Sequence, residues 1–142
     1  MNDNMDIRAL SNMLSDLSSY AQKISKNSYS PYSKFKVGVA VLCEDNKVFC
    51  GTNVENVSYG LSMCAERVAI FTAIANGCKK IKAVAIYSKK ANVTPCGACR
   101  QVILEFSKNA DIIYNTDKNN FKVIKISKLL PESFDKTSLT WK

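Results

Sequence analysis

The sequence predicts an α/β fold, a three-layer α/β/α sandwich around a five-stranded mixed sheet. Two observations support this prediction. Apolar residues at helical spacing alternate along the 142-residue chain with short strand-like runs, in the order α, β, β, α, β, α, β, β. The length suits one domain, and no run of about 18 apolar residues offers a transmembrane helix. Strands interspersed with helices favour a central sheet that is covered on both faces.

The first predicted elements are an amphipathic helix and a β-hairpin. Apolar side chains from Ile7 to Ile24 recur at three- and four-residue spacing, which predicts a helix over 5–26 that ends before Pro31. The period then changes to two and predicts a strand over 35–43. After a turn at 44–46, a second strand is predicted over 47–54, so the two strands form a hairpin.

The second half of the chain alternates helices with short strands. Helical spacing over 64–75 stops at Gly77, a residue suited to the position just after a helix. A strand at 83–87, a helix opened by Pro95, and strands at 111–114 and 121–126 follow. About five residues, 115–119, separate the last two strands. Because a parallel crossover takes about a dozen residues or more, we expect these strands to pair antiparallel.

The amino-acid composition limits the kinds of catalytic site and of binding partner that the protein can have. The chain has six cysteines and no histidine, which excludes a Ser-His-Asp triad, a Cys-His protease and imidazole ligands to zinc. The net charge of +8 comes mostly from dispersed lysines. We interpret it as a solubilising surface and expect neither nucleic acid nor membrane as a partner. The acidic, polar N-terminus lacks the features of a secretory signal, so we expect a cytoplasmic protein with reduced cysteines.

Three cysteines, Cys43, Cys50 and Cys78, match no motif, and we expect them to be core residues because free cysteine is among the most buried residue types. A Cys43–Cys50 bridge across the hairpin is geometrically conceivable, but a reducing cytosol disfavours it.

The other three cysteines form the pattern that carries chemistry. Cys96 and Cys99 are a C-x-x-C pair at a predicted helix N-terminus, where the helix dipole favours thiolates. Alone, the pair suits either a metal or a thioredoxin-like redox dithiol. Cys64 begins another predicted helix and supplies a third thiolate. Three protein ligands leave one tetrahedral position open, as in a catalytic zinc site.

Two charged residues accompany Cys64. With no histidine to carry protons, Glu66 is the nearest carboxylate in sequence, although positions 64 and 66 do not share a helix face. Arg67 stands three residues after Cys64 and should share its face, where a guanidinium offsets the negative charge of three thiolates. We therefore expect the Arg67 guanidinium to donate a hydrogen bond to a thiolate sulfur rather than to bind the metal itself.

Five spaced motifs resemble the cytidine deaminase family. They are FKVG at 35–38, NVEN at 53–56, CAER at 64–67, PCGACRQ at 95–101 and LLPESF at 129–134. The CAER and PCGACRQ motifs resemble the two-part zinc signature of these enzymes in its all-cysteine form. The resemblance covers nearly the whole chain and implies a cytidine deaminase-like fold. It implies a single domain over 1–142, with a helix at 5–26, a catalytic core at 30–134 and a short tail at 135–142.

The resemblance also implies an activity and an assembly. The activity is hydrolytic deamination of cytidine and deoxycytidine to uridine and deoxyuridine plus ammonia, a step of pyrimidine salvage, by a zinc-bound hydroxide with a Glu proton shuttle. The cofactor is one Zn²⁺ per subunit. The assembly is a homotetramer with intersubunit active sites, and the substrate is a free nucleoside.

Roles for individual residues follow from the same resemblance. They are Cys64, Cys96 and Cys99 as zinc ligands, Glu66 as the catalytic acid and base, Asn53 and Glu55 on the ribose hydroxyls, Phe35 against the pyrimidine, the Ala65 backbone at the base edge, and Phe134 in a neighbouring subunit's pocket.

Several alternatives stay open. A deaminase for a cytosine-containing antibiotic such as blasticidin shares the zinc motif, and a non-catalytic zinc-binding module could keep the three cysteines. A redox protein would form a reversible Cys96–Cys99 disulfide and hold no metal. Deaminases of polynucleotides usually carry a histidine ligand and a helix between the last two strands, and this sequence has neither the histidine nor the room.

Overall fold

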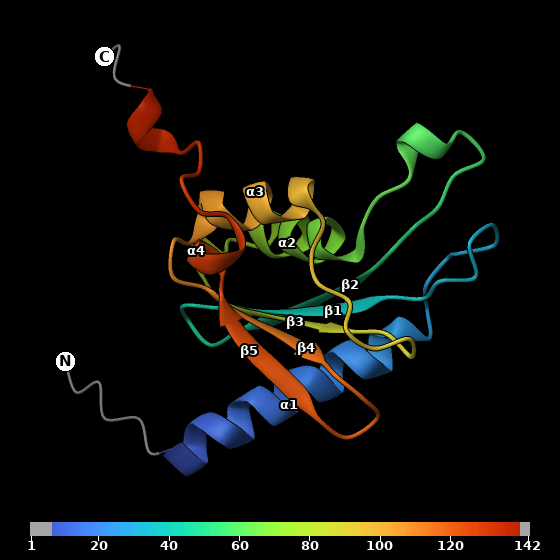
Figure 1. Ribbon diagram of the computed structural model, residues 1–142, viewed down its shortest axis with the longest axis horizontal. Helices are drawn as coiled ribbons and strands as arrows, with labels where there is room; N and C mark the ends of the chain where they lie inside the picture. The colour runs from blue at the N-terminus through green and yellow to red at the C-terminus, as the bar shows by residue number, and fades with distance from the viewer. Residues whose placement is uncertain (1–6, 140–142) are drawn as a thin grey trace.

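A computed structural model describes residues 7–139 of the chain; the predicted helix start at residue 5 and Trp141 of the predicted tail lie outside that range. Figure 1 shows a central sheet with one long helix on one face and two helices on the other. This arrangement confirms the predicted three-layer α/β/α sandwich with five strands. The elements are α1 (Ile7–Ser25), β1 (Gly38–Cys43), β2 (Val48–Thr52), η1 (Tyr59–Leu61), α2 (Ala65–Ala75), β3 (Ile81–Tyr87), α3 (Gly97–Phe106), β4 (Asp111–Asn115), β5 (Phe121–Lys125), α4 (Ile126–Leu129) and η2 (Lys136–Ser138).

The sheet is mixed, as predicted, with strand order β2-β1-β3-β4-β5. β1 pairs antiparallel with both β2 and β3, and β3 pairs parallel with β4 across the helical crossover through α3. β4 and β5 pair antiparallel, which confirms the inference from their short connection. The parallel pair places the loop that enters α3 at the same end of the sheet as the N-terminus of α2 (Figure 1).

Side chains along β1 alternate between the two faces of the sheet. Val39 and Val41 join the core under α2 and α3, and Ala40 and Leu42 join the core under α1. Three alanines of the sheet, Ala40, Ala83 and Ala85, pack under α1, so α1 approaches the sheet closely. A Cβ built on Gly38 would lie 2.1 Å from the carbonyl oxygen of Ala21 in α1, so only glycine fits there.

A second close approach holds α2 against β2. A Cβ built on Gly51 would lie 2.5 Å from the backbone nitrogen of Ala69 and 2.9 Å from its Cα. Backbone atoms of a packed helix cannot swing aside as a flexible side chain does. Gly51 therefore sets the distance between the edge strand and the helix that begins just after Cys64.

The predicted strands differ from the observed ones at their ends: those expected over 47–54, 83–87 and 111–114 are shifted by one or two residues in β2, β3 and β4. The differences in the other two strands have clear physical causes. The strand expected over 35–43 begins only at Gly38, because the side chain of Asn53 takes the place of a ladder partner for the preceding residues. Its Oδ1 accepts from the Val37 backbone at 3.0 Å, and its Nδ2 donates to the Phe35 carbonyl at 2.7 Å. The strand expected over 121–126 ends at Lys125, since Ile126 begins the short helix α4.

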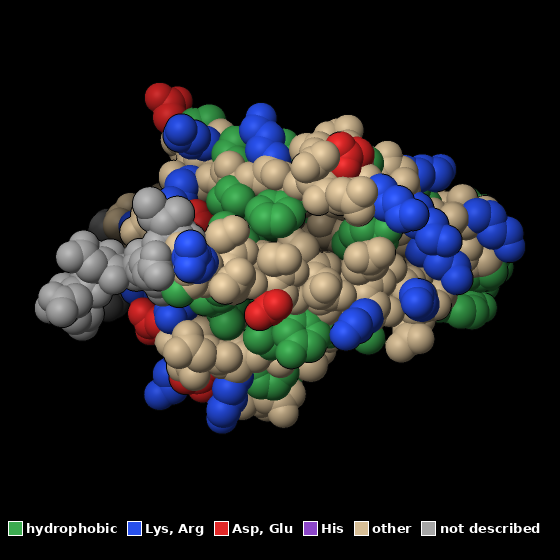
Figure 2. Space-filling view, turned by 90° about the horizontal axis from the view of Figure 1, so that it is seen from below, with side chains coloured by type: hydrophobic (Ala, Val, Ile, Leu, Met, Phe, Trp, Pro, Cys, Tyr) green, Lys and Arg blue, Asp and Glu red, His purple; other side chains and the backbone are tan. Residues whose placement is uncertain are grey.

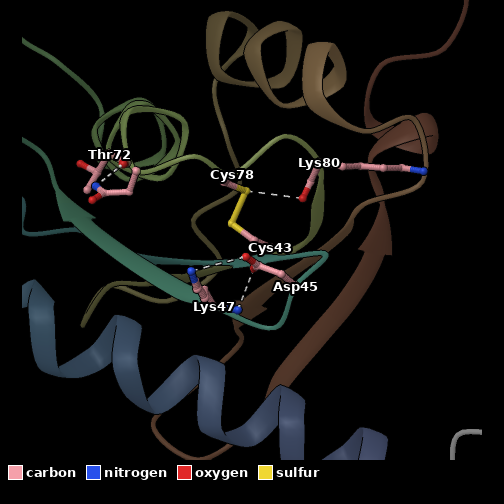
Figure 3. Close-up of a disulfide and its surroundings, with 7 residues drawn as sticks. Cys43, Asp45, Lys47, Thr72, Cys78 and Lys80 are labelled. Carbon is pink, nitrogen blue, oxygen red and sulfur yellow. Dashed lines mark hydrogen bonds and ion pairs between the residues drawn. A yellow bond between two sulfur atoms is a disulfide. The ribbon is translucent and has the colours of Figure 1, made fainter.

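The expectation of free core cysteines is wrong for two of the three. Cys43 at the end of β1 and Cys78 in the loop after α2 are both buried, but they form a disulfide with a Cα–Cα distance of 6.0 Å (Figure 3). The two residues are 35 positions apart, and the closed loop contains β2 and α2. Cys50 remains a free thiol and is half-buried.

The α1 side of the molecule shows how the positive charge is spread. In Figure 2, which views that side, lysine and arginine side chains lie mostly around the rim, with acidic and polar groups between them. No basic stripe crosses the centre of this face. Within the part of the chain that the structure describes, no helix is long and apolar enough to cross a membrane.

Candidate active site

Three cysteines meet where the N-termini of two neighbouring helices lie at the same end of the sheet (Figure 1). Cys64 is the N-cap of α2, Cys96 is the N-cap of α3, and Cys99 lies in the first turn of α3. Their Sγ atoms all lie within 4.8 Å of one another. Cys99 is fully buried, Cys64 is half-buried and Cys96 is exposed, so the cluster opens to solvent on one side.

The spacing of the thiols fits a tetrahedral zinc site. The Cys64 and Cys96 sulfurs are 3.8 Å apart. Two ligands at about 2.3 Å from a tetrahedral Zn²⁺ lie about 3.8 Å from one another. Three sulfurs with one open side leave a fourth position for water or substrate. Among the described residues, these three cysteines form the one group of three or more potential ligand side chains whose ligand atoms lie close enough together to hold a metal ion.

The hydrogen bonds in the cluster favour a thiolate at Cys64. A hydrogen bond from Cys99, helped by the guanidinium of Arg67, lowers the pKa of Cys64 to about 5, and the same interaction raises the pKa of Cys99. Arg67 donates from Nη2 to the Cys64 sulfur at 3.5 Å. Its Nε is buried and has no hydrogen-bond partner among the described residues. The dipoles at the N-termini of α2 and α3 also favour a thiolate over a neutral thiol.

Glu66 lies in the first turn of α2, two residues after Cys64, and is 4% exposed. Burial is the main reason that its pKa is raised to about 7. A carboxyl group with such a pKa can take up and release a proton near neutral pH. The structure therefore places, beside Cys99 of the thiol cluster, a carboxyl group that can exchange protons near neutral pH, in a chain that has no histidine.

The two residues predicted to bind the sugar both contact the segment before β1. Asn53 uses one N–H of its amide on Phe35, and its Oδ1 also accepts from the Ser28 hydroxyl. Glu55 accepts from the backbone of Tyr32 at 3.0 Å and of Ser33 at 3.1 Å, and also from the Ser33 hydroxyl. The Ser33 hydroxyl is the main reason that the pKa of Glu55 lies below its ordinary value. These two side chains hold the 28–37 segment in place.

Glu55 also borders an open cavity of about 330 Å³. The aromatic rings of Tyr32 and Tyr59 contact edge to face across it, with a centroid distance of 5.8 Å, and the other lining residues are Ser33 and Ser62. Carboxylate, hydroxyl and aromatic groups together suit a polyhydroxylated ligand. The thiol cluster does not line this cavity.

The remaining predicted site residues lie in different surroundings. Phe35 is half-buried against the core, and the Lys90 ammonium lies 5.1 Å from its ring centroid. Ala65 is buried at the first position of α2. Phe134 is 63% exposed, and its carbonyl accepts from Gln101 Nε2 at 2.8 Å. In contrast to Cys64, Cys96 and Cys99, Phe134 does not join the thiol cluster.

The sequence analysis missed some residues that shape the site. A glycine inside a predicted strand is a signal of close backbone approach, and that signal could have identified Gly51. Arg100 follows Cys99 and donates to the carbonyl oxygens of Pro95 at 2.7 Å and Leu129 at 2.8 Å. No local pattern predicts these contacts, because Leu129 is 29 positions away from Arg100.

Comparisons with known proteins agree with this site. The family model described as the cytidine and deoxycytidylate deaminase zinc-binding region matches residues 11–116. A cytidine deaminase from Sporosarcina psychrophila is 42% identical over 123 residues, which cover 85% of this chain and 90% of the relative. A cytidine deaminase from Halalkalibacterium halodurans is 42% identical over 111 residues, covering 77% of this chain and 84% of the relative.

Solved structures agree as well. The crystal structure of a cytidine deaminase from Burkholderia pseudomallei has a TM-score of 0.80 and 40% sequence identity, over 84% of this chain and 98% of that one. The crystal structure of cytidine deaminase from Mycobacterium tuberculosis has a TM-score of 0.75 and 36% identity, over 84% and 95%. With its zinc-compatible thiol cluster and these matches along most of its length, the chain belongs to the cytidine and deoxycytidylate deaminase family and carries that family's zinc-binding region.

Proposed function

We propose that the chain hydrolyses cytidine and deoxycytidine to uridine and deoxyuridine, releasing ammonia, as a step of pyrimidine salvage. The observation that carries the proposal is the cluster of three thiols at two helix N-termini, with buried Glu66 beside it, in a chain whose relatives are cytidine deaminases. The deaminase unit is proposed to span 1–142, with the catalytic core at 30–134.

Cys64, Cys96 and Cys99 are the proposed ligands of one Zn²⁺ per subunit. When bound there, the metal supplies Lewis acidity that lowers the pKa of a water molecule. Arg67 offsets the charge of the thiolates through its hydrogen bond to Cys64. A cytoplasmic location is part of the proposal, because a reducing compartment keeps the three site thiols available as metal ligands. The Cys43–Cys78 disulfide is compatible with that location only because both of its cysteines are buried, which limits the access of a reducing thiol.

Glu66 is the proposed proton carrier. It accepts a proton from the attacking water and donates it to ring N3 while the water oxygen bonds to C4. It then takes the proton of the new C4 hydroxyl and gives it to the exocyclic amino group, so that the C4 carbonyl forms, the C–N bond breaks and ammonia leaves. General acid–base catalysis of this kind contributes about 10²- to 10⁴-fold in rate. The burial of Glu66 supports the role, since a desolvated carboxyl exchanges protons near neutral pH.

Asn53 and Glu55 are the proposed ribose ligands. One N–H of the Asn53 amide donates to the Phe35 carbonyl, and the same NH₂ group has a second N–H that can donate to a ligand. Glu55 accepts three hydrogen bonds, and a carboxylate has about four acceptor positions. Each side chain thus retains capacity for one sugar hydroxyl. Phe35 is proposed to contact the pyrimidine, and the backbone at Ala65 to meet the base edge.

Phe134 is proposed to enter the pocket of a neighbouring subunit in a homotetramer. Its anchor, Gln101, stands two positions after Cys99 on α3, about 200° around the helix axis. The segment that carries Phe134 therefore lies on the side of α3 that faces away from the thiol cluster of its own subunit. The 63% exposure of the Phe134 ring supports this proposal, because an exposed ring can contact another copy.

The test is ammonia release from cytidine, deoxycytidine and blasticidin, together with zinc quantitation. Glu66→Gln is expected to keep about one zinc per chain and lose at least about 10²-fold in kcat. Glu44→Gln, a surface carboxylate paired with Lys80, is the matched control and should behave like the parent. Cys99→Ala should lose zinc as well as activity. Near-normal turnover by Glu66→Gln, or turnover of blasticidin alone, would contradict the proposal.

A further inference from the structure

Residues 129–136 run along α3 and are called here the C-terminal strap. In Figure 1 this segment passes beside α3 after leaving α4. Four polar contacts join the strap to α3 and the residues just after it. They are Arg100 to the Leu129 carbonyl at 2.8 Å, Gln101 to the Phe134 carbonyl at 2.8 Å, Lys136 to Glu105 at 3.8 Å, and Lys108 to Asp135 at 3.3 Å.

The four contacts are not equivalent. The two ion pairs involve lysines that are 60% and 73% exposed, and exposed pairs contribute little to stability. Arg100 and Gln101 instead hold backbone carbonyls, and they stand directly after Cys99 in the chain. Arg100 also donates to the Pro95 carbonyl at 2.7 Å, one residue before Cys96. One guanidinium thus joins the turn that carries a proposed zinc ligand to the start of the strap.

Gln101 holds the other end of the strap through the main chain. Its Nε2 contacts the carbonyl of Phe134, and the aromatic ring of Phe134 stays largely exposed. A hydrogen bond to the carbonyl fixes where the Cα of this residue stands without covering its side chain. An exposed aromatic ring on a backbone anchored in this way is held ready for contact with another surface.

We propose that Gln101 is a positioning residue for substrate binding: with Arg100 it fixes the strap on α3, and so determines where Phe134 is presented to the neighbouring subunit. The inference rests on the proposed function, which assigns Phe134 to that pocket. Gln101 itself touches neither substrate nor metal in this account. Its effect is transmitted through the position of Phe134, and the zinc ligands keep their places because Arg100 holds the turn before Cys96.

The first measurement compares Gln101→Met, which keeps the length of the side chain and removes the donor, with Glu105→Gln, which weakens a neighbouring strap contact. Loss of one hydrogen bond corresponds to about a three- to ten-fold change in an equilibrium constant. Gln101→Met is expected to raise KM for cytidine by that factor, with kcat and zinc content close to those of the parent. Glu105→Gln should leave KM unchanged. An equal rise in both variants would overturn the proposal, because it would indicate general loosening of the strap.

A double mutant then tests whether Gln101 acts through Phe134. Phe134→Ala should raise KM, and adding Gln101→Met to it should raise KM no further. Additive effects in the double mutant would overturn the proposal. If Phe134→Ala leaves KM unchanged in an active enzyme, Phe134 is not a substrate-pocket residue and the positioning role fails with it.

Hydrogen exchange provides a readout that does not depend on turnover. Peptides covering 129–136 should exchange faster in Gln101→Met than in the parent, while peptides covering 64–75 exchange at the parent's rate. Unchanged exchange in the strap overturns the positioning role even if the parent enzyme is active. Absence of cytidine turnover in the parent refutes the proposed function instead, so the two failures are distinguishable.

Discussion

Replacing Gly51 with alanine places a methyl group against the backbone of the helix that carries Glu66. The added Cβ would lie 2.5 Å from the nitrogen of Ala69, 2.9 Å from its Cα and 3.0 Å from the carbonyl carbon of Val68. Ordinary contacts begin at 3.4 Å. Since all three obstacles are helix backbone, α2 and β2 have to separate by about 1 Å at this point.

The separation affects both stability and chemistry. Overpacking a core in this way costs about 1–3 kcal/mol in the free energy of unfolding. Because Cys64, Glu66 and Arg67 begin α2, a shift of the helix also moves them relative to Cys96 and Cys99. A misplacement of about 1 Å costs about 10²-fold in rate. We therefore expect Gly51→Ala to fold with reduced stability and to lose about two orders of magnitude in kcat/KM.

Urea unfolding followed by circular dichroism gives the free energy, and ammonia release gives kcat/KM. Gly60→Ala is the matched stability control, because a Cβ at Gly60 meets no atom within 4 Å and should change the free energy of unfolding by less than about 0.5 kcal/mol. Gly51→Ala with a parental free energy of unfolding and full activity would refute the account of how β2 positions the site helix.

Two further predictions concern the disulfide and the segment before β1. A cross-link that closes a loop of 35 positions contributes about 4 kcal/mol through loop entropy, so reduction of Cys43–Cys78 should lower the free energy of unfolding by up to that amount. Unfolding with and without dithiothreitol measures the effect, Cys50→Ser is the thiol control, and identical curves would contradict it. Hydrogen bonds from Ser33 and Tyr32 hold the pKa of Glu55 below 4.5, so its stabilisation is present above that pH and is lost as the pH falls through the folded-state pKa. The stability gap between the parent and Glu55→Gln should therefore close on acidification, and a gap that widens toward low pH would show the wrong sign.

Elements that depend on nearby residues were predictable. The spacing of apolar residues located the helices and strands, and Gly77, with φ of 95°, ends α2 as expected. The spacing of Cys96 and Cys99 within one helical turn was predictable for the same reason. Their meeting with Cys64, 32 positions before Cys96, was predictable only because both motifs resemble the two-part zinc signature. The start of β1 was not predictable. The side chain of Asn53, 16 to 18 positions away, bonds the Val37 N–H and the Phe35 carbonyl, so these groups do not pair with another strand.

Pairings across long stretches of chain could not be predicted. No pattern in the sequence shows that Cys43 meets Cys78, because the partner depends on how the end of β1 stacks beside the loop after α2. The same holds for Arg100 and Leu129, whose contact requires the chain to return past α3. Local physics therefore predicts which chemistry is present, and tertiary packing decides which residues support it.

The place of β5 at the edge of the sheet gives part of the positive charge a physical role. Within the described residues, no strand pairs with the outer edge of β5, whose only strand partner is β4. Lys122 lies on this exposed strand and Lys118 at the turn before it, while Lys125 pairs with Asp111 of β4 at 2.8 Å. Lysines on an open edge resist the addition of a foreign strand, because pairing would strip water from their ammonium groups. Because the same strand also exposes Phe121 and Val123, these lysines are the charged groups on β5 and at the turn before it that oppose pairing of its edge with a foreign strand.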